Sequence, residues 1–186
     1  MTIYHWRIIG IIASAVFMAV GVSAQKELRF SVGNSFIDER FPGGEMYSVL
    51  LGSFGRSKQL TKKDTRISLR MHEDLQFGLG STHTRGNRDF DLAFNIVIEG
   101  VWQVTKPIAL TFSIGSGPAY QSTSTALQAK GFVYSNNFTA GLRLNLSNSI
   151  VLMPQVRFRH MSNAGWKAPN NGIDNFFVLI ACAKKL

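Results

Sequence analysis

Segments in which apolar and polar residues alternate recur along the chain after its first two dozen residues. Because successive side chains of a β-strand point to opposite faces, each segment predicts a strand with one apolar and one polar face. In the second segment the alternation is less clear. The predicted strands lie around residues 28–33, 47–54, 67–79, 90–99, 108–115, 138–146, 149–162 and 174–182.

The seventh segment indicates where the apolar faces point. One of its faces carries Ile150, Leu152, Pro154, Val156, Phe158, His160 and Ser162. The opposite face carries Val151, Met153, Gln155, Arg157, Arg159 and Met161. In a small membrane barrel the apolar face meets lipid and the arginines occupy a lumen filled by side chains, and eight strands is the smallest common size. The sequence therefore predicts an all-β fold, an eight-stranded antiparallel transmembrane β-barrel.

The lengths of the connections predict an orientation. The short joins at residues 105–107 and 147–148 are typical of periplasmic turns. Longer connections on the opposite rim are predicted at residues 34–46, 80–89, 122–136 and 163–173. The segment 56–65 is long and basic for a periplasmic turn. Pro154 predicts a bulge or another local irregularity, since proline removes one hydrogen bond from the ladder.

The N-terminus predicts export. Arg7 precedes an apolar run from Ile8 to Val22, and Val22-Ser23-Ala24 forms a small-residue cleavage site, so residues 1–24 are expected to be a signal peptide and residues 25–186 the barrel domain. The alternative is a retained anchor, but the run is shorter than the roughly 20 residues of a spanning helix. Nothing later in the chain is long and apolar enough to span as a helix. The single cysteine excludes an internal disulfide.

Charge and cofactor motifs narrow the class of protein. The formal net charge of +9 would be compatible with nucleic-acid binding, but export argues against that partner. Cations in the predicted turns can meet anionic headgroups or phosphorylated glycolipid, or they can simply be solvated. No cluster of histidine and cysteine has metal-ligand spacing, and no glycine-rich phosphate loop is present, so neither a metal nor a cofactor is expected.

Three residues on the predicted lipid face could carry chemistry. His160 and Ser162 share one face of their strand, and Asp174 begins the next strand with the parity of its lipid side. A neutral histidine can take the proton of a serine hydroxyl, and a carboxylate can hold the ring in the correct tautomer. Taken singly, each residue has a simpler interpretation: an interfacial histidine, a turn serine and an aspartate that caps a strand start.

The sequences His160-Met161-Ser162-Asn163-Ala164-Gly165 and Pro169-Asn170-Asn171-Gly172-Ile173-Asp174 resemble the signature of the lipid A 3-O-deacylase family, outer-membrane barrels also named acyloxyacyl hydrolases. The resemblance implies a hydrolytic triad of His160, Ser162 and Asp174 on the outside of the barrel. The family acid is typically glutamate, whereas this chain has aspartate. The resemblance also implies that Gly165 and Asn170 form an oxyanion hole. Phe138 is expected to face lipid and to border the acyl groove, and Trp166 is expected to be an interfacial aromatic residue that touches the acyl chain.

The predicted function is that of a serine esterase that removes the ester-linked 3-hydroxyacyl chain at position 3 of lipid A, in the outer leaflet of a Gram-negative outer membrane. Lipopolysaccharide is the predicted partner, and dimerisation is left open. Two alternatives belong to other classes. One is a non-catalytic barrel that serves as an adhesin or structural protein. The other is a soluble lipocalin-like carrier, which would expose Asp91, Glu99, Arg143, Arg157 and Arg159 to water.

Overall fold

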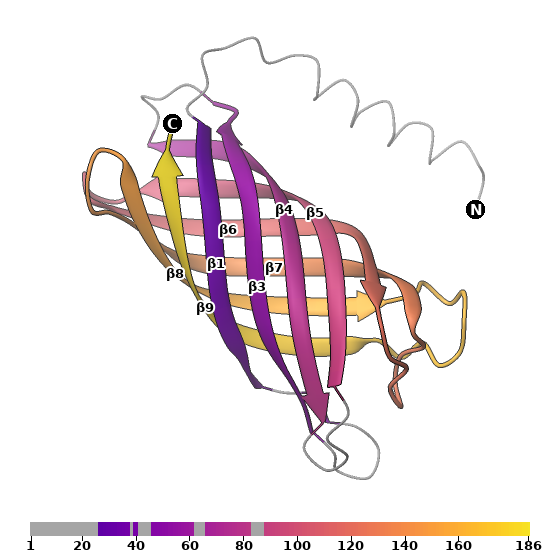
Figure 1. The fold of residues 1–186 in the computed structure, drawn as a ribbon. Coiled ribbons are helices and arrows are strands. Elements are labelled where there is room, and N and C mark those ends of the chain that lie inside the picture. Colours follow the sequence, from indigo (N-terminus) through magenta and orange to yellow (C-terminus); the bar gives the residue numbers. More distant parts are fainter. Residues whose placement is uncertain (1–25, 38, 41–45, 62–65, 83–87) are drawn as a thin grey trace, which may run out of the picture.

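The computed structural model describes residues 26–37, 39–40, 46–61, 66–82 and 88–186, so the predicted signal peptide lies outside the described residues. Figure 1 shows a barrel of long, tilted strands. None of the described residues forms a helix that is long and apolar enough to cross a membrane. The strands are β1 (Lys26–Ile37), β2 (Glu39–Arg40), β3 (Met46–Gln59), β4 (Ile67–Thr82), β5 (Arg88–Gln103), β6 (Ile108–Gln121), β7 (Gly131–Asn145), β8 (Ile150–Ser162) and β9 (Ile173–Lys185).

The sheet closes on itself. From β3 to β9 each strand pairs antiparallel with its neighbour in sequence, and β1 pairs with both β3 and β9. The two-residue strand β2 only extends the pairing at the start of β3. Within the described residues the barrel therefore has eight long strands, which confirms the predicted fold class and strand number.

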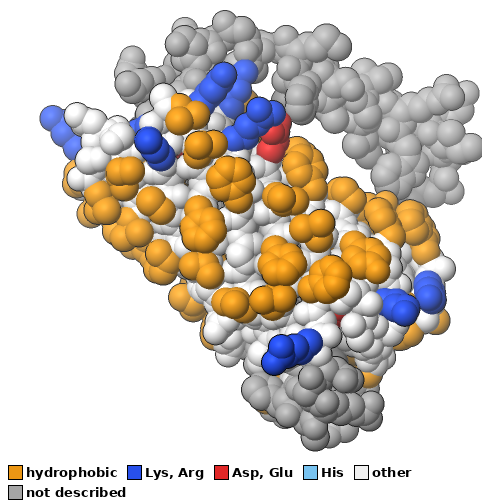
Figure 2. Space-filling view, viewed as in Figure 1, with side chains coloured by type: hydrophobic (Ala, Val, Ile, Leu, Met, Phe, Trp, Pro, Cys, Tyr) orange, Lys and Arg blue, Asp and Glu red, His pale blue; other side chains and the backbone are white. Residues whose placement is uncertain are grey.

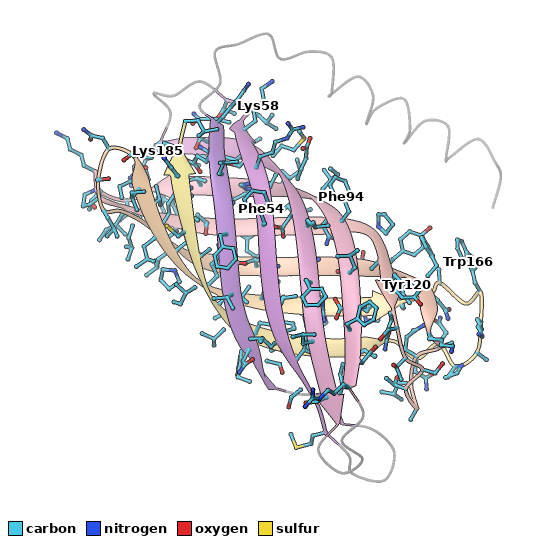
Figure 3. All side chains as sticks on the ribbon, in the orientation of Figure 1. Phe54, Lys58, Phe94, Tyr120, Trp166 and Lys185 are labelled. Carbon is cyan, nitrogen blue, oxygen red and sulfur yellow. The ribbon has the colours of Figure 1, made fainter. Side chains whose placement is uncertain are left out.

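Apolar side chains cover the outside of this barrel. Figure 2 shows them across the middle of the visible face, with Lys and Arg side chains gathered toward its ends. Phe54 and Phe94 lie on this outer surface in Figure 3, and Phe112 is 60% exposed. Such an exposed apolar belt suits contact with lipid and would be unfavourable in water. This arrangement excludes the soluble carrier, in which the apolar face would line an internal cavity.

Charged pairs fill the lumen. Glu27 forms ion pairs with Arg70 and Arg143. Arg159 donates hydrogen bonds to both carboxylate oxygens of Asp91, at 2.8 and 3.0 Å. A second network joins Arg29 and His72 to Glu99. Buried charges are tolerated when they are paired in this way. A lumen cavity beside these networks, lined in part by Asp74 and Arg157, measures only about 30 Å³.

The two rims of the barrel differ. Residues 104–107 and 146–149 form tight turns on the same rim as the start of β1 and the end of β9, which identifies the periplasmic rim. The longer connections at residues 122–130 and 163–172 lie on the opposite, outer-leaflet rim. The end of β8 and the start of β9 therefore meet at the outer-leaflet side of the membrane.

Some strand boundaries differ from the sequence prediction, whereas the irregularity predicted at Pro154 is present. Strand β7 begins at Gly131, so residues 131–136 belong to a strand and not to a loop, and β3 extends through residues 56–59, which shortens the basic turn. At Pro154 the pairing with β9 continues, whereas the pairing with β7 is interrupted between Gly141↔Gln155 and Leu144↔Leu152 without a change of register. Pro154 thus causes a local irregularity without a bulge.

Candidate functional site

His160 and Asp174 meet on the outer surface of the barrel. The two residues are direct partners in the β8–β9 ladder, and both have outward parity. The Nδ1 atom of His160 lies 2.6 Å from Oδ1 of Asp174. Their side chains are 33% and 49% exposed, respectively. Directly paired residues of an antiparallel ladder lie close together. The aspartate side chain is therefore long enough to reach the ring, although it is shorter than the glutamate typical of the family.

Ser162 is the last residue of β8 and faces outward on the same side as His160. Residues i and i+2 of a strand have Cα atoms roughly 6.5–7 Å apart, so rotamer changes can bring the hydroxyl to the ring. Within the described residues, the Ser162 side chain has no hydrogen-bond partner. With Nδ1 of His160 bonded to Asp174, the ring nitrogen available to this hydroxyl is Nε2.

A polar row crosses four adjacent strands at the level of His160. The ladder pairs Ser116 on β6 with Asn136 on β7, Asn136 with His160, and His160 with Asp174. Each of these residues has the outward parity of its strand, and Ser116 Oγ donates to Oδ1 of Asn136 at 2.7 Å. Polar groups that face lipid are costly and mark functional positions. Ser116 and Asn136 were not predicted from the sequence, although their outward parity was a signal that could have identified them.

Gly172 packs against the ring of His160. A Cβ atom placed on this glycine would lie 2.5 Å from Cε1 of the ring and 3.2 Å from Nε2. The backbone φ of Gly172 is also +82°, a conformation that L-residues with a side chain rarely adopt. Both constraints require glycine here. The sequence prediction included Gly172 in the motif without giving it a role.

The loop at residues 163–172 is built around the buried side chain of Asn163. Its Nδ2 donates to the carbonyl of Lys167 at 2.6 Å, and its Oδ1 accepts from the N–H of Gly165 at 3.1 Å. The backbone N–H of Asn163 donates to Oδ1 of Asn170 at 2.8 Å. The Asn170 amide group is thereby oriented, and its Nδ2 has no partner among the described residues. Of the two predicted oxyanion donors, Asn170 therefore has an open donor, whereas the Gly165 N–H is already bonded within the loop.

A second loop, residues 122–130, fixes the first one in place. Gln128 and Asn170 form an isolated antiparallel bridge. The N–H of Ala129 donates to the carbonyl of Pro169 at 2.9 Å, and the N–H of Asn171 donates to the carbonyl of Leu127 at 2.8 Å. Leu127 in turn packs against the apolar cluster formed by Tyr47, Val49, Leu51, Ile173, Phe177 and Leu179 at the mouth of the barrel. This support holds the Asn170 side chain near the outer end of β8.

An open groove begins at His160 and crosses the outside of the barrel toward β5. Its volume is about 620 Å³. Ser116, Asn136 and His160 give it a polar edge, and the rest of its lining is largely apolar. The other lining residues are Ile96, Ile98, Ile114, Gly115, Asn137, Phe138 and Phe158. A groove of this size and lining suits an alkyl chain better than a soluble polar ligand.

The two predicted substrate-contacting aromatic residues occupy different places. Phe138 lies in the groove, with its ring centroid 6.2 Å from that of Phe158. Trp166 projects from the loop at the outer-leaflet rim and is 68% exposed (Figure 3). It stacks on Phe132 at 5.3 Å between ring centroids and meets Tyr134 edge-on at 6.1 Å. Tyr134 is the ladder partner of Ser162, so this aromatic cluster borders the serine.

The site combines the parts that ester hydrolysis needs. A hydroxyl, an imidazole held by a carboxylate, an open amide donor and an apolar groove lie together on a surface that faces lipid. In the described part of the chain, no group of three or more His, Cys, Asp or Glu side chains is placed to hold a metal ion.

A protein-family model matches more than half of the chain. The family model described as lipid A 3-O-deacylase (PagL) matches residues 56–183. The matched region includes all residues of the candidate triad and the loop that follows β8. A comparison with curated proteins gave no match.

Solved outer-membrane barrels share the fold. The crystal structure of the outer membrane enzyme PagL aligns with a TM-score of 0.57 at 20% identity, covering 83% of this chain and 97% of that chain. Neisserial surface protein A (NspA) aligns with a TM-score of 0.58 at 9% identity, covering 87% and 97%. Ail, the attachment invasion locus protein of Yersinia pestis, in complex with sucrose octasulfate, aligns with a TM-score of 0.51 at 8% identity, covering 89% and 100%. At these identities the structures establish the fold alone.

Proposed function

Because this chain belongs to the lipid A 3-O-deacylase (PagL) family and is an outer-membrane lipid A deacylase, we propose that it removes the ester-linked 3-hydroxyacyl chain at position 3 of lipid A by a Ser162–His160–Asp174 mechanism. The observation that carries this proposal is the direct contact of His160 with Asp174 on the lipid-facing surface, two residues from Ser162. Membership of this family favours an enzyme over the non-catalytic barrel that the sequence alone also allowed.

In the proposed first step, Nε2 of His160 takes the proton of Ser162 as Oγ attacks the carbonyl carbon of the ester. Asp174 holds the Nδ1 proton of the ring and stabilises the imidazolium that forms. Collapse of the tetrahedral intermediate breaks the bond to the sugar oxygen, which leaves with the proton from His160. Water, activated by the same histidine, then hydrolyses the acyl-serine and releases the fatty acid.

The negative charge on the carbonyl oxygen needs preorganised donors. Asn170 is the stronger candidate, because its carbonyl oxygen is already bound to the Asn163 N–H and its Nδ2 is open. The Gly165 N–H can contribute if it releases Oδ1 of Asn163. We propose that both donate to the oxyanion and that Asn170 makes the larger contribution.

Substrate reaches this site by moving within the membrane plane. Lipid A already lies in the outer leaflet, and the groove lined by Phe138 and Phe158 opens on the apolar surface of the barrel. We propose that this groove holds the chain being removed. The cluster of Trp166, Phe132 and Tyr134 stands at the rim, where its rings meet the boundary between acyl chains and headgroups.

Mass spectrometry of lipid A tests the proposal. Lipid A extracted from cells that express the protein should lose one 3-hydroxyacyl chain relative to cells that carry an empty vector. Fragmentation should assign the loss to position 3 of the disaccharide. Loss of an acyl chain from another position would contradict the proposed specificity, and unchanged lipid A across several lipid A structures would contradict deacylation itself.

Replacement of Asp174 by asparagine should lower the rate by about a hundredfold, because the amide cannot hold the Nδ1–H tautomer of His160 or stabilise the imidazolium. The expected loss is smaller than for a fully buried triad acid, since Asp174 is half exposed and water can partly replace it. Deacylation rates of the purified variants measure the effect. Asp174→Glu, which restores the usual acid of the family, should stay within about tenfold of the wild type. Equal losses in the two variants would contradict a role for the charge.

A further inference from the structure

Ser116 and Asn136 form the part of the polar row that extends from His160 into the largely apolar groove. They are direct ladder partners on β6 and β7, joined by the 2.7 Å hydrogen bond between Ser116 Oγ and Asn136 Oδ1. Both face the lipid side, and both line the groove next to His160. Their neighbours on the same faces are apolar, including Ile114 and Phe138. An alkyl chain without polar groups would gain nothing from this pair.

The pair offers one open donor and one open acceptor. When Ser116 donates to Oδ1 of Asn136, the Nδ2 group of Asn136 has no partner among the described residues and the lone pairs of Ser116 Oγ remain open. If the amide were turned by 180°, Nδ2 would donate to Ser116 Oγ and leave one hydroxyl proton and one carbonyl oxygen. In both orientations the pair matches a group that donates one hydrogen bond and accepts another. A hydroxyl group is such a group.

The position of Ser116 and Asn136 determines which part of a bound acyl chain they contact. Asn136 is the ladder partner of His160, and neighbouring strands lie about 4.8 Å apart. Consider an acyl chain with its ester carbonyl at Ser162 and His160 and its tail in the groove. Such a chain passes Asn136 within its first few carbon atoms. A hydroxyl group near the carbonyl end is therefore within reach, whereas one near the tail would lie over Ile96 and Ile98.

We propose that Ser116 and Asn136 recognise the hydroxyl group of a 3-hydroxyacyl chain and so make the enzyme selective for hydroxylated over unsubstituted acyl esters. The inference rests on the proposed function, because it takes the ester at Ser162 as the reacting group. In this proposal Asn136 and Ser116 form hydrogen bonds with the substrate and do not position the triad.

The test compares two synthetic glucosamine lipids that carry one ester at position 3, either 3-hydroxytetradecanoyl or tetradecanoyl. The full mature barrel in detergent should cleave the hydroxylated ester with a kcat/KM about tenfold higher, as expected for two hydrogen bonds at a partly exposed site. Asn136→Leu should remove this preference by slowing only the hydroxylated substrate. Ser116→Ala should reduce it in the same direction. Phe138→Leu, a change in the apolar lining of the same groove, should slow both substrates in equal proportion.

The outcomes separate this inference from the proposed function. A wild type that cleaved both esters equally, or an Asn136→Leu variant that kept the wild-type preference, would overturn the recognition site while ester hydrolysis stood. If Asn136→Leu slowed the cleavage of both esters equally, Asn136 would act by positioning His160. That result would also overturn the recognition site. A folded wild type that cleaved neither ester would overturn both proposals.

Discussion

Replacement of Ser162 by alanine is expected to lower lipid A deacylation by at least about a thousandfold. The hydroxyl is the proposed nucleophile, and Ser162 lies on the face where His160 is held by Asp174. Removing the oxygen leaves no group on the protein to form the acyl-enzyme, while the groove and the oxyanion donors remain. The measurement is the rate of acyl-chain release by the purified variant, with the lipid product identified by mass spectrometry.

Binding provides the control for this substitution. Ser162 is at the outer end of β8 and contributes little to packing, so the alanine variant should fold and should still bind lipid A. Ser162→Cys keeps a nucleophilic atom at the position and should form a detectable acyl adduct. Full activity in the alanine variant would exclude the serine mechanism, and His160 would then have to activate water directly.

Replacement of Gly172 by alanine should reduce the rate by about a hundredfold, although the residue carries no chemistry. Its new Cβ would stand 2.5 Å from Cε1 of His160, so the ring or the loop must move. Misplacement of a catalytic group by about 1 Å can cost a factor of this order. The loss should appear mainly in kcat, because the apolar lining of the proposed acyl groove is not altered.

Gly131 is a matched control for this effect. Its φ is also positive, at +111°, but a Cβ there would have no neighbour within 4 Å. Gly131→Ala therefore carries a comparable backbone cost without contact with the histidine. If both variants lost activity equally, backbone strain at the outer rim of the barrel would explain the result, and the close packing of Gly172 on the ring would not.

Strand parity made much of this site predictable. The alternation in β8 placed His160 and Ser162 on the lipid side before any pairing was known, and Asp174 has the same parity on β9. Parity cannot say which residues of neighbouring strands are opposite one another. That depends on register, and the register is what joins Asn136 to His160 and Ser116 to Asn136.

The start of β7 shows why one boundary was missed. Phe132 and Tyr134 face outward, but Asn136 follows them on the same side, and the inward positions hold Val133 beside polar residues. The expected contrast between an apolar outer face and a polar inner face is therefore weak in this stretch. At the candidate site a groove with a polar edge interrupts the apolar outer surface, so the alternation that predicts a strand is weaker here.

The roles of Asn163 and Leu127 also lay beyond the sequence. A buried asparagine that organises a loop has the same appearance in a sequence as an exposed turn residue, and only the hydrogen bonds to Gly165 and Lys167 distinguish them. Leu127 acts through a contact between two loops that are far apart in the chain.

The ion pairs that fill the lumen leave no wide aqueous channel through the described barrel. Glu27 with its two arginines, and Arg159 with Asp91, occupy the space through which solutes cross a porin. The proposed catalytic groups lie on the outer wall of the barrel, so turnover needs no aqueous passage. We therefore expect expression of the protein to leave the outer membrane no more permeable to small solutes.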